Sequence, residues 1–397
     1  MQVNNDVSKI DELLTRGVEE IIDIKDLKEK LLSGQKLRIK LGIDPTSPNI
    51  HLGRSIPLLK LRDFQNLGHQ IVFIVGDFTG VVGDTSDKDS ERPMLTSKII
   101  KENLKDYKKQ IGKIIDVRKA EFKPNSKWLG KLSYAHIGEQ ADIFSINQFI
   151  SRDNIRRRLD EGKRVSLREV LYPLMQGYDS VAVKADVELG GTDQKFNLLA
   201  GRDLQKHFGQ TPQNILMNPL IEGLDGRKMS SSWGNTVNFL DSANEMFGKI
   251  MSLKDEFIVK YFELLTRVPL TDVSEYKSKL ENGENPKNIK VILAKTIVAM
   301  YHSEKDADKA AEAWEETFSK GGIPTDIETV TVASGMKLKN VLVENKIVES
   351  NSEFTRLLSA GAIKNADSEE KIMTDIEITE NQILKVGKRR FVKILVK

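Results

Sequence analysis

Residues 40–62, KLGIDPTSPNIHLGRSIPLLKLR, decide the fold, because they predict a strand, a loop and a helix in direct succession. Over residues 37–43 apolar residues alternate with polar residues or glycine, which is typical of a strand that enters a core. The two prolines that follow rule out an immediate helix, and we expect the next helix to run from an N-cap at Asn49 to a stop at Gly68. The unpaired backbone N–H groups of its first turn would face an anion such as phosphate.

Two residues of that first turn, His51 and Gly53, are candidates for contact with a nucleotide. Gly53 lacks a Cβ and would let a ribose or a base approach the backbone, and His51 can donate a hydrogen bond to a phosphate oxygen. The alternative for His51 is a surface histidine at a helix N-terminus. A second loop, GRKMSSS at residues 226–232, is small and cationic; it is either a solvated turn or a partner of the first loop.

The composition limits the kinds of protein and of site. The 397 residues are 39% hydrophobic and 30% charged, which predicts two or three globular domains. No apolar run could span a bilayer and residues 1–33 lack the apolar core of a signal peptide, so we expect a cytoplasmic protein with no membrane partner. The chain has no cysteine, and its five histidines have no mutual ligand spacing, which argues against a thiolate or zinc site.

A second apolar run, QIVFIVG at residues 70–76, predicts a parallel strand that is buried on both faces. The glycine-rich loop after it carries Asp84. In open α/β sheets ligands bind beyond the carboxyl ends of such strands, so Asp84 is a candidate to hold a cation, for example a substrate ammonium group. The alternative is a carboxylate that caps the next turn.

Three polar residues, Tyr172, Gln176 and Asp179, are spaced by four and three, which places them on one face of a predicted helix. On an otherwise apolar helix they cost stability unless an enclosed polar ligand satisfies them. We expect a buried strand over residues 181–187, followed by a Gly-Gly turn in which Asp193 suits the hydroxyls of a ribose.

The remaining segments before residue 320 carry no visible chemistry. We expect one amphipathic helix over residues 6–33, basic helices over residues 97–131 and around residue 155, and a strand near residue 215. The cations of these helices could meet phosphates, although a solvated, salt-bridged face is the commoner outcome for such patterns.

In this order, the motifs resemble the paired signatures of class I aminoacyl-tRNA synthetases, usually His-Ile-Gly-His and Lys-Met-Ser-Lys-Ser, which stand here as HLGR and KMSSS. The Asp-Pro-Thr segment, the Gly83–Asp84 pair, the three polar helix residues and the GGTDQ turn resemble, more narrowly, the bacterial tyrosyl-tRNA synthetases. The resemblance covers essentially the whole chain. It implies an α/β fold with a Rossmann-like parallel-sheet catalytic domain, a helical domain and a small α+β domain of the S4 type.

The activity that the resemblance implies is ATP-dependent activation of tyrosine to tyrosyl-adenylate, followed by transfer of tyrosine to the 3′ end of its tRNA. ATP is a substrate, with Mg²⁺ on its triphosphate, and no protein-bound metal is implied. The substrate carboxylate is the nucleophile, so catalysis consists of positioning and charge stabilisation. A homodimer is also implied, with its interface within about residues 120 to 180.

The resemblance further implies three sets of site residues. Those at the reacting phosphates are Thr46, His51, Arg54 and Lys228. Those at the tyrosine are Asp84, Tyr172 and Gln176 around the ammonium group, Asp179 at the phenol and Gln194 near the reacting end. Those at ATP are Gly42, Asp44, His51, Gly53, Gly191, Asp193, Lys228, Met229 and Ser230.

Four positions depart from the usual pattern. Arg54 stands where the first signature has its second histidine, and Ser231 stands where the other has its second lysine, so one cation has moved between the loops. We expect Arg54 to supply part of the phosphate charge that Ser231 cannot. Lys40 replaces a tyrosine that helps to hold the phenol in many relatives, and Glu188 replaces a frequent glutamine; the two are candidates for a pair.

The expected domains are a catalytic domain at residues 1–225 with a connective insertion at about 97–165, the KMSSS loop and a helical domain at 226–320, a linker at 321–330 and an S4-like RNA-binding domain at 331–397. This last domain carries 12 Lys+Arg against 9 Asp+Glu, which accounts for the whole +3 excess of the chain. Arg356, Lys388 and Arg389 are its candidate phosphate contacts, with a solvated surface as the alternative. Within it we expect a helix that begins at a capping box at Ser350 and a basic strand over residues 386–394.

Two other functions fit parts of the pattern. A tryptophanyl-tRNA synthetase would share the fold, but Asp179 and the S4-like tail argue against it. A non-catalytic RNA-binding module on the same fold has no evident reason to keep His51, Asp193 and Lys228 together.

Overall fold

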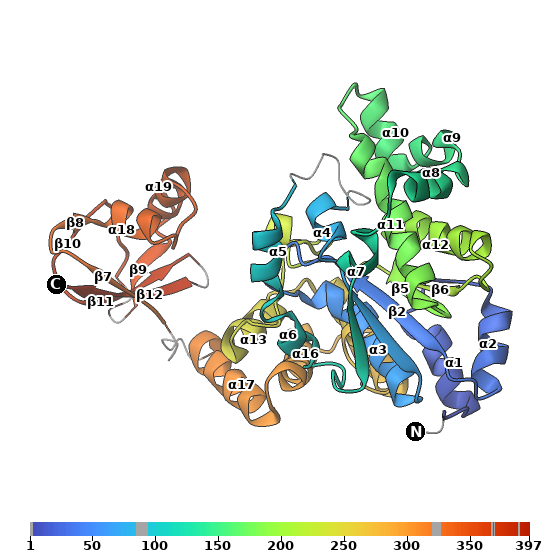
Figure 1. The fold of residues 1–397 in the computed structure, drawn as a ribbon. Helices are drawn as coiled ribbons and strands as arrows, with labels where there is room; N and C mark the ends of the chain where they lie inside the picture. Colours follow the sequence, from blue (N-terminus) through green and yellow to red (C-terminus); the bar gives the residue numbers. More distant parts are fainter. Residues whose placement is uncertain (1–2, 85–93, 320–326, 367, 369, 388–389) are drawn as a thin grey trace. The chain divides into compact units, whose positions relative to one another are not determined.

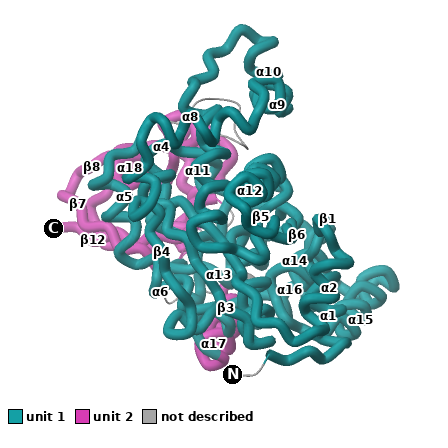
Figure 2. The backbone as a smooth tube through the Cα atoms, turned by 45° about the vertical axis from the view of Figure 1, so that its right-hand side comes forward, with its two compact units in different colours: residues 1–303 teal, residues 304–397 magenta. Residues whose placement is uncertain are grey.

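The computed structural model describes residues 3–84, 94–319, 327–366, 368, 370–387 and 390–397. The chain divides into two compact units, residues 1–303 and residues 304–397 (Figure 2). Two of the predicted RNA contacts, Lys388 and Arg389, lie outside the described residues. Every residue predicted to contact tyrosine or ATP belongs to the first unit.

A six-stranded sheet forms the centre of the first unit (Figure 1), and its strands are β1 (Glu20–Ile22), β2 (Arg38–Ile43), β3 (Gln70–Val75), β4 (Ala120–Pro124), β5 (Val187–Gly191) and β6 (Asn214–Asn218). Their order in the sheet is β1-β6-β5-β2-β3-β4. All neighbours pair in parallel except β1, which joins β6 antiparallel at the edge. The predicted parallel α/β sheet is therefore confirmed.

The strand order reverses between β2 and β5. From β2 the chain moves to β3 on one side, and from β5 it moves to β6 on the other. Because parallel crossovers are right-handed, the connecting helices α3 (Ser55–Asn66) and α12 (Lys195–His207) cover opposite faces of the sheet. Ligands bind at such a reversal, beyond the carboxyl ends of the strands.

The stretch that decides the fold forms its strand and helix as expected, with one change at the start of the helix. The chain first makes a short 3₁₀ turn, η1 (Leu52–Arg54), with His51 at its N-cap, and α3 follows; Asn49 is therefore not the cap. Gly68 ends the helix with a φ of 95°, as predicted.

The helix that carries the three polar residues is longer than expected. α11 (Leu167–Val183) begins with a capping box between Ser166 and Glu169 and ends at Lys184, which has a left-handed φ of 50°. Residues 181–183 are thus helical and residues 184–186 connect the helix to β5, so the prediction of a strand over residues 181–187 is wrong for all of them except Val187. An apolar run of that length fits a buried helix end as well as a strand.

Two other predicted helices are interrupted by strands. Residues 6–33 form α1 (Val7–Thr15), β1 and α2 (Ile24–Leu32), because β1 finds an edge partner in β6. Residues 97–131 form α5 (Ser97–Leu104), α6 (Tyr107–Ile111), β4 and α7 (Ser126–Leu129).

The other helices of the first unit are α4 (Thr79–Val82), α8 (Tyr134–Asp142), α9 (Ile146–Ile150), α10 (Asp153–Asp160), α13 (Ala243–Met251), α14 (Ile258–Leu265), α15 (Leu270–Glu281) and α16 (Pro286–Tyr301), with 3₁₀ turns η2 (Thr192–Gln194), η3 (Ser231–Trp233) and η4 (Asp255–Phe257).

The second unit is a small α+β fold with its own core. Its elements are α17 (Glu304–Ser319), β7 (Glu328–Val332), β8 (Met336–Lys337), α18 (Leu338–Glu344), α19 (Asn351–Ser359), β9 (Ile363–Asn365), β10 (Glu377–Ile378), β11 (Gln382–Val386) and β12 (Arg390–Val396). The sheet order β7-β12-β11-β9 replaces the single strand expected over residues 386–394, because β11 and β12 pair antiparallel. Ser350 caps α19 by accepting a hydrogen bond from the N–H of Glu353, but the predicted capping box is not complete, because the Glu353 side chain accepts from the N–H of Glu349 instead of Ser350.

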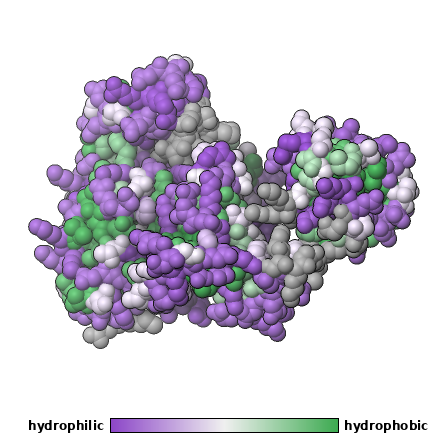
Figure 3. Space-filling view, turned by 180° about the vertical axis from the view of Figure 1, so that it is seen from behind, coloured by the Kyte–Doolittle hydropathy of each residue, from purple (hydrophilic) through white to green (hydrophobic). Residues whose placement is uncertain are grey.

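In the view of Figure 3, the surface of each unit is mostly hydrophilic, and smaller hydrophobic areas lie among the hydrophilic residues. Within the described residues, no helix has both the length and the apolar character needed to cross a bilayer.

Candidate active site

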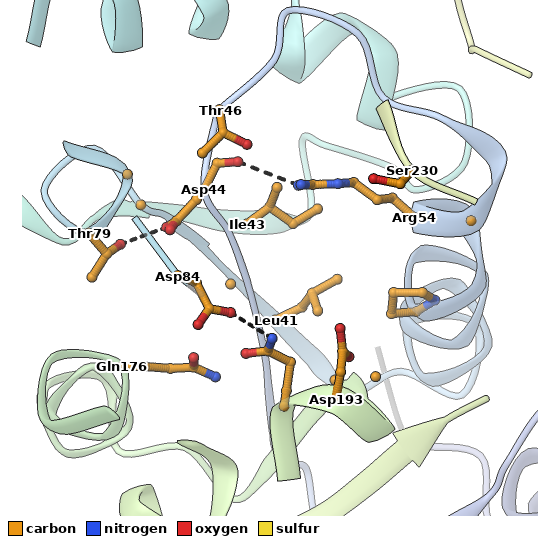
Figure 4. Close-up of a pocket in the computed structure, with 18 of the residues that line it drawn as sticks. Leu41, Ile43, Asp44, Thr46, Arg54, Thr79, Asp84, Gln176, Asp193 and Ser230 are labelled. Atoms are coloured by element: carbon orange, nitrogen blue, oxygen red, sulfur yellow. Dashed lines mark hydrogen bonds between the residues drawn. The ribbon is translucent and has the colours of Figure 1, made fainter. Parts of the chain in front are cut away.

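A cavity of about 460 Å³ opens at the strand reversal, and every residue predicted to contact tyrosine or ATP lines it. Its walls are the carboxyl ends of β2, β3 and β5, one face of α11, and the loops at residues 44–54 and 228–232. In Figure 4, Thr79, Asp84 and Gln176 lie on one side of the cavity, and Arg54, Asp193 and Ser230 lie on the other. Of these residues, Asp84 and Gln176 were predicted to contact tyrosine, and Arg54, Asp193 and Ser230 were predicted for the reacting phosphates or ATP; Thr79 was in neither set.

Asp84 belongs to a chain of hydrogen bonds on the first side. Gln194 Nε2 donates to Asp84 Oδ2 over 2.7 Å, and Asn197 Nδ2 donates to the side-chain oxygens of both Gln194 and Gln176 over 3.0 Å. These bonds fix the orientation of both amides. The sequence analysis missed Asn197, although it lies three residues after the Gly-Gly turn, one helical turn along α12.

Tyr172 is oriented by a buried carboxylate. Its hydroxyl donates to Asp44 Oδ2 over 2.8 Å, and the hydroxyl of Thr79 donates to Asp44 Oδ1 over 2.7 Å. Burial raises the pKa of Asp44 to about 6. Gly76 makes this arrangement possible, since a Cβ there would lie 2.0 Å from Asp44 Oδ1. With its proton directed at Asp44, the Tyr172 oxygen offers lone pairs to a donor such as an ammonium group.

Asp179 is held by two residues that sequence reasoning did not identify. Trp128 Nε1 donates to Asp179 Oδ1 over 2.7 Å, and Asn125 Nδ2 donates to Asp179 Oδ2 over 3.2 Å and to the hydroxyl oxygen of Thr79 over 2.9 Å. Burial raises the pKa of Asp179 to about 7, against the opposing effect of the Lys40 charge. No motif marks Asn125 or Trp128, which lie at the end of β4 and in α7.

The candidate pair of Lys40 and Glu188 is confirmed. Lys40 Nζ lies 2.8 Å from Glu188 Oε1, and each side chain is only 1% exposed. The two residues are register partners on β2 and β5, at the strand reversal itself.

His51 is a neutral side chain on the phosphate side. Burial, with Arg54 and Lys228 nearby, lowers its pKa to about 3. Its ring packs against Gly53, where a Cβ would lie 3.1 Å from the ring atoms, and its Nδ1 has no hydrogen-bond partner among the described residues. A buried ring nitrogen of this kind is available to a ligand.

The second signature loop lies against the first. The N–H of Gly53 donates to Met229 Sδ over 3.1 Å, and Lys228 Nζ lies 2.9 Å from Asp193 Oδ2 on the turn after β5. Arg54 Nη1 approaches the carbonyl oxygen of Asp44 at 3.4 Å, which is a long contact for a guanidinium (Figure 4). Three cationic or donor groups, Arg54, Lys228 and His51, thus border one end of the cavity.

The described residues contain no group of three or more His, Asp or Glu side chains arranged to hold a metal ion.

Comparison with known proteins identifies the family. Residues 32–319 match the family model described as tRNA synthetases class I (W and Y). The tyrosine–tRNA ligase of Idiomarina loihiensis is 45% identical over 387 residues, covering 96% of both chains. That of Shewanella oneidensis is 46% identical over 388 residues, covering 96% of this chain and 97% of its own. The chain belongs to the bacterial tyrosyl-tRNA synthetases.

Solved structures agree with this assignment. The tyrosyl-tRNA synthetase of Archaeoglobus fulgidus, solved with L-tyrosine, is 25% identical, with a TM-score of 0.62 over 77% of this chain and all of its own. A truncated mitochondrial tyrosyl-tRNA synthetase of Aspergillus nidulans shares the fold, with a TM-score of 0.66 and 20% identity over 79% of this chain and 94% of its own. As a tyrosyl-tRNA synthetase, the chain is a tyrosine–tRNA ligase that uses ATP, and a tryptophanyl activity or a non-catalytic module is not favoured.

One predicted RNA contact can be located. Arg356 is exposed on α19 in the second unit, on the helix that begins at Ser350. It stays a prediction.

Proposed function

We propose that the cavity at the strand reversal activates tyrosine with ATP, and that each predicted residue has the role that its chemistry allows. The observation that carries the proposal is that one cavity holds a buried carboxylate, Asp179, at one end and neutral His51 with Lys228 at the other. This spacing of groups suits a substrate with a phenol at one end and a reacting carboxylate at the other.

On the tyrosine side, Asp179 accepts a hydrogen bond from the phenol. A buried carboxylate held by Trp128 and Asn125 is costly to leave without that partner, which disfavours phenylalanine. Asp84 supplies charge to the ammonium group, the Tyr172 oxygen accepts from it, and Gln176 completes its shell, while Gln194 lies near the reacting end of the substrate.

On the ATP side, Thr46, His51, Arg54 and Lys228 stabilise charge that develops on the phosphates, since no side chain needs to act as a nucleophile. Asp193 and Gly191 receive the ribose. The remaining ATP contacts are Gly42, Asp44, Gly53, Met229 and Ser230. Mg²⁺ enters with the triphosphate and adds charge neutralisation there.

The second unit binds the tRNA as an S4-like domain, in which Arg356 is a phosphate contact. The chain acts as a homodimer through residues within about 120 to 180. Exposed apolar side chains in that range support this surface: Tyr134 is 94%, Leu167 68% and Ile146 57% exposed.

The test is amino-acid-dependent exchange of labelled pyrophosphate into ATP without tRNA, with tyrosine, phenylalanine and tryptophan compared. We expect exchange with tyrosine and Mg²⁺ only. Exchange with tryptophan would overturn the assignment of Asp179 to the phenol. Exchange with none of the three would overturn activation by this cavity alone.

A further inference from the structure

The buried pair of Lys40 and Glu188 lies directly beneath the tyrosine side of the cavity. Both charges are almost completely removed from water, at 1% exposure each. Such a pair is weak evidence for stability, because desolvation offsets the attraction between the charges. Its contacts indicate a different role.

All three donors of the Lys40 ammonium are used by the protein. Besides Glu188, Nζ donates to the backbone oxygen of Gln176 over 2.9 Å and to the hydroxyl oxygen of Ser180 over 2.7 Å. An ammonium has three N–H donors, so none is left for a substrate phenol. Lys40 therefore does not replace the phenol contact of the tyrosine found at this position in many relatives; it anchors α11 on either side of Asp179.

Glu188 makes the complementary contacts. Its Oε1 lies 3.4 Å from Gln176 Nε2, and its Oε2 accepts from the hydroxyl of Ser180 and from the side chain of Gln213. The pair thus holds Gln176 through both its backbone and its side chain. Asp179 lies between Gln176 and Ser180 on α11, and its pKa responds to both charges of the pair: Lys40 on β2 lowers it and Glu188 on β5 raises it. Tyr172 of α11 is a further titratable group beside it.

We propose that Lys40 and Glu188 form a positioning unit for tyrosine recognition, which orients Gln176 and fixes the turn of α11 that carries Asp179, the acceptor for the phenol. The unit touches no substrate atom and acts through these two residues. This inference rests on the proposed function, in which Asp179 reads the phenol.

The test compares Lys40→Met, Glu188→Gln and the double variant in pyrophosphate exchange. Lys40→Met leaves Glu188 buried without its cation, and we expect KM for tyrosine to rise about 10-fold or more while KM for ATP changes less than about 2-fold. We also expect tyrosine binding to weaken at a higher pH than in the unmodified chain, because removing the Lys40 charge raises the pKa of Asp179. The double variant leaves no unpaired charge and is expected to regain part of the loss, so the two effects are not additive.

Lys60→Met is the matched control, because Lys60 is also a lysine at 1% exposure, but its ammonium donates to the backbone oxygens of Leu13 and Arg16 and lies 3.9 Å from Asp63, outside the cavity. We expect it to lower the melting temperature and to leave KM for tyrosine unchanged. The inference is overturned if Lys40→Met raises the two KM values equally or no more than the control does. If Lys40→Met does not fold, the inference is overturned by a double variant whose KM for tyrosine and whose pH dependence of tyrosine binding equal those of the unmodified chain.

The proposed function is tested separately by the same assay. Exchange that depends on tyrosine in the unmodified chain, together with lost discrimination against phenylalanine in Asp179→Asn, would uphold that function even if the Lys40 variants behaved as the control.

Discussion

Two ionisable residues of the cavity respond differently to pH. Asp179, with a pKa of about 7, is protonated below that pH, and its neutral carboxyl is then a weaker acceptor for the hydrogen bond from a phenol. His51, with a pKa of about 3, stays neutral. We therefore predict that kcat/KM for tyrosine falls as the pH drops through about 7, by roughly 10-fold per unit.

Pyrophosphate exchange measured between about pH 5.5 and 8.5 checks this prediction. His51→Asn should slow exchange at every pH and keep the fall in rate near pH 7, whereas Asp179→Asn should keep only a fall near pH 6, where Asp44 is protonated. An acid limb that disappears in His51→Asn would assign the titration to the histidine and contradict the structural account.

Arg54 supports the second residue-scale prediction. Among the described residues its guanidinium makes one hydrogen bond, a 3.4 Å contact to the carbonyl oxygen of Asp44, and it borders the cavity together with Lys228. We predict that Arg54→Ala lowers kcat for activation by about 10- to 100-fold and leaves KM for tyrosine unchanged, because the positive charge that stabilises the reacting phosphates is lost. Arg54→Lys should recover part of the rate.

The control for Arg54 is Arg227→Ala. Arg227 directly precedes the KMSSS signature, as Arg54 ends the HLGR signature. Unlike Arg54, it is paired with Asp225, stacks on Trp233 and does not line the cavity. Equal rates for Arg54→Ala and the unmodified chain would show that the cation has no part in activation.

Residues inside recognisable motifs could be predicted, and residues that support them could not. His51, Asp193 and Lys228 stand in short segments of unusual composition, so their types and order carry information. Asn125 and Trp128 act only because β4 brings them against Asp179 across 51 or more residues of chain. Nothing in their local sequence distinguishes them from a solvated segment.

At the scale of elements, the packing of α11 on α12 is the most demanding contact. A Cβ at Gly177 would lie 2.7 Å from Leu204 Cδ1 and 3.1 Å from backbone atoms of Ala200 and Gly201. Gly177→Ala must therefore separate the two helices. We predict a loss of about 1–3 kcal/mol in the free energy of unfolding and a higher KM for tyrosine, since Gln176 moves with the helix.

Gly248→Ala in α13 is the matched helical control. Nothing lies within 4 Å of a Cβ there, so we expect a small gain in stability from the better helix former. Denaturant unfolding and exchange kinetics on both variants check the pair. Equal stability of the two would mean that the helix contact is looser than the structure describes.

Element boundaries were hardest to predict where one pattern fits two structures. The apolar run at residues 181–187 belongs partly to α11 and partly to β5, and only the position of β5 between β2 and β6 decides where the strand begins. β4 was missed because all five of its residues are half-buried, so no alternation of buried and exposed residues marks it.

For the whole molecule, we predict that the division into two units separates activation of tyrosine from binding of the tRNA. All residues that line the cavity lie in the first unit, between Lys40 and Ser232. We predict that a chain ending at Ser319 keeps tyrosine-dependent pyrophosphate exchange within about 3-fold but loses at least about 100-fold in tRNA charging, because the cationic tail is absent. Full charging by the shortened chain would exclude the tail from tRNA binding.

The most direct test of the central claim is a crystal structure of the chain with bound tyrosine. We predict that the phenol oxygen lies about 2.6–3.0 Å from the carboxylate of Asp179, with the ammonium group among Asp84, Tyr172 and Gln176 and with Lys40 still bound to Glu188. A phenol bound by Lys40, or a tyrosine in the reverse orientation with its ammonium group at Asp179, would contradict the account.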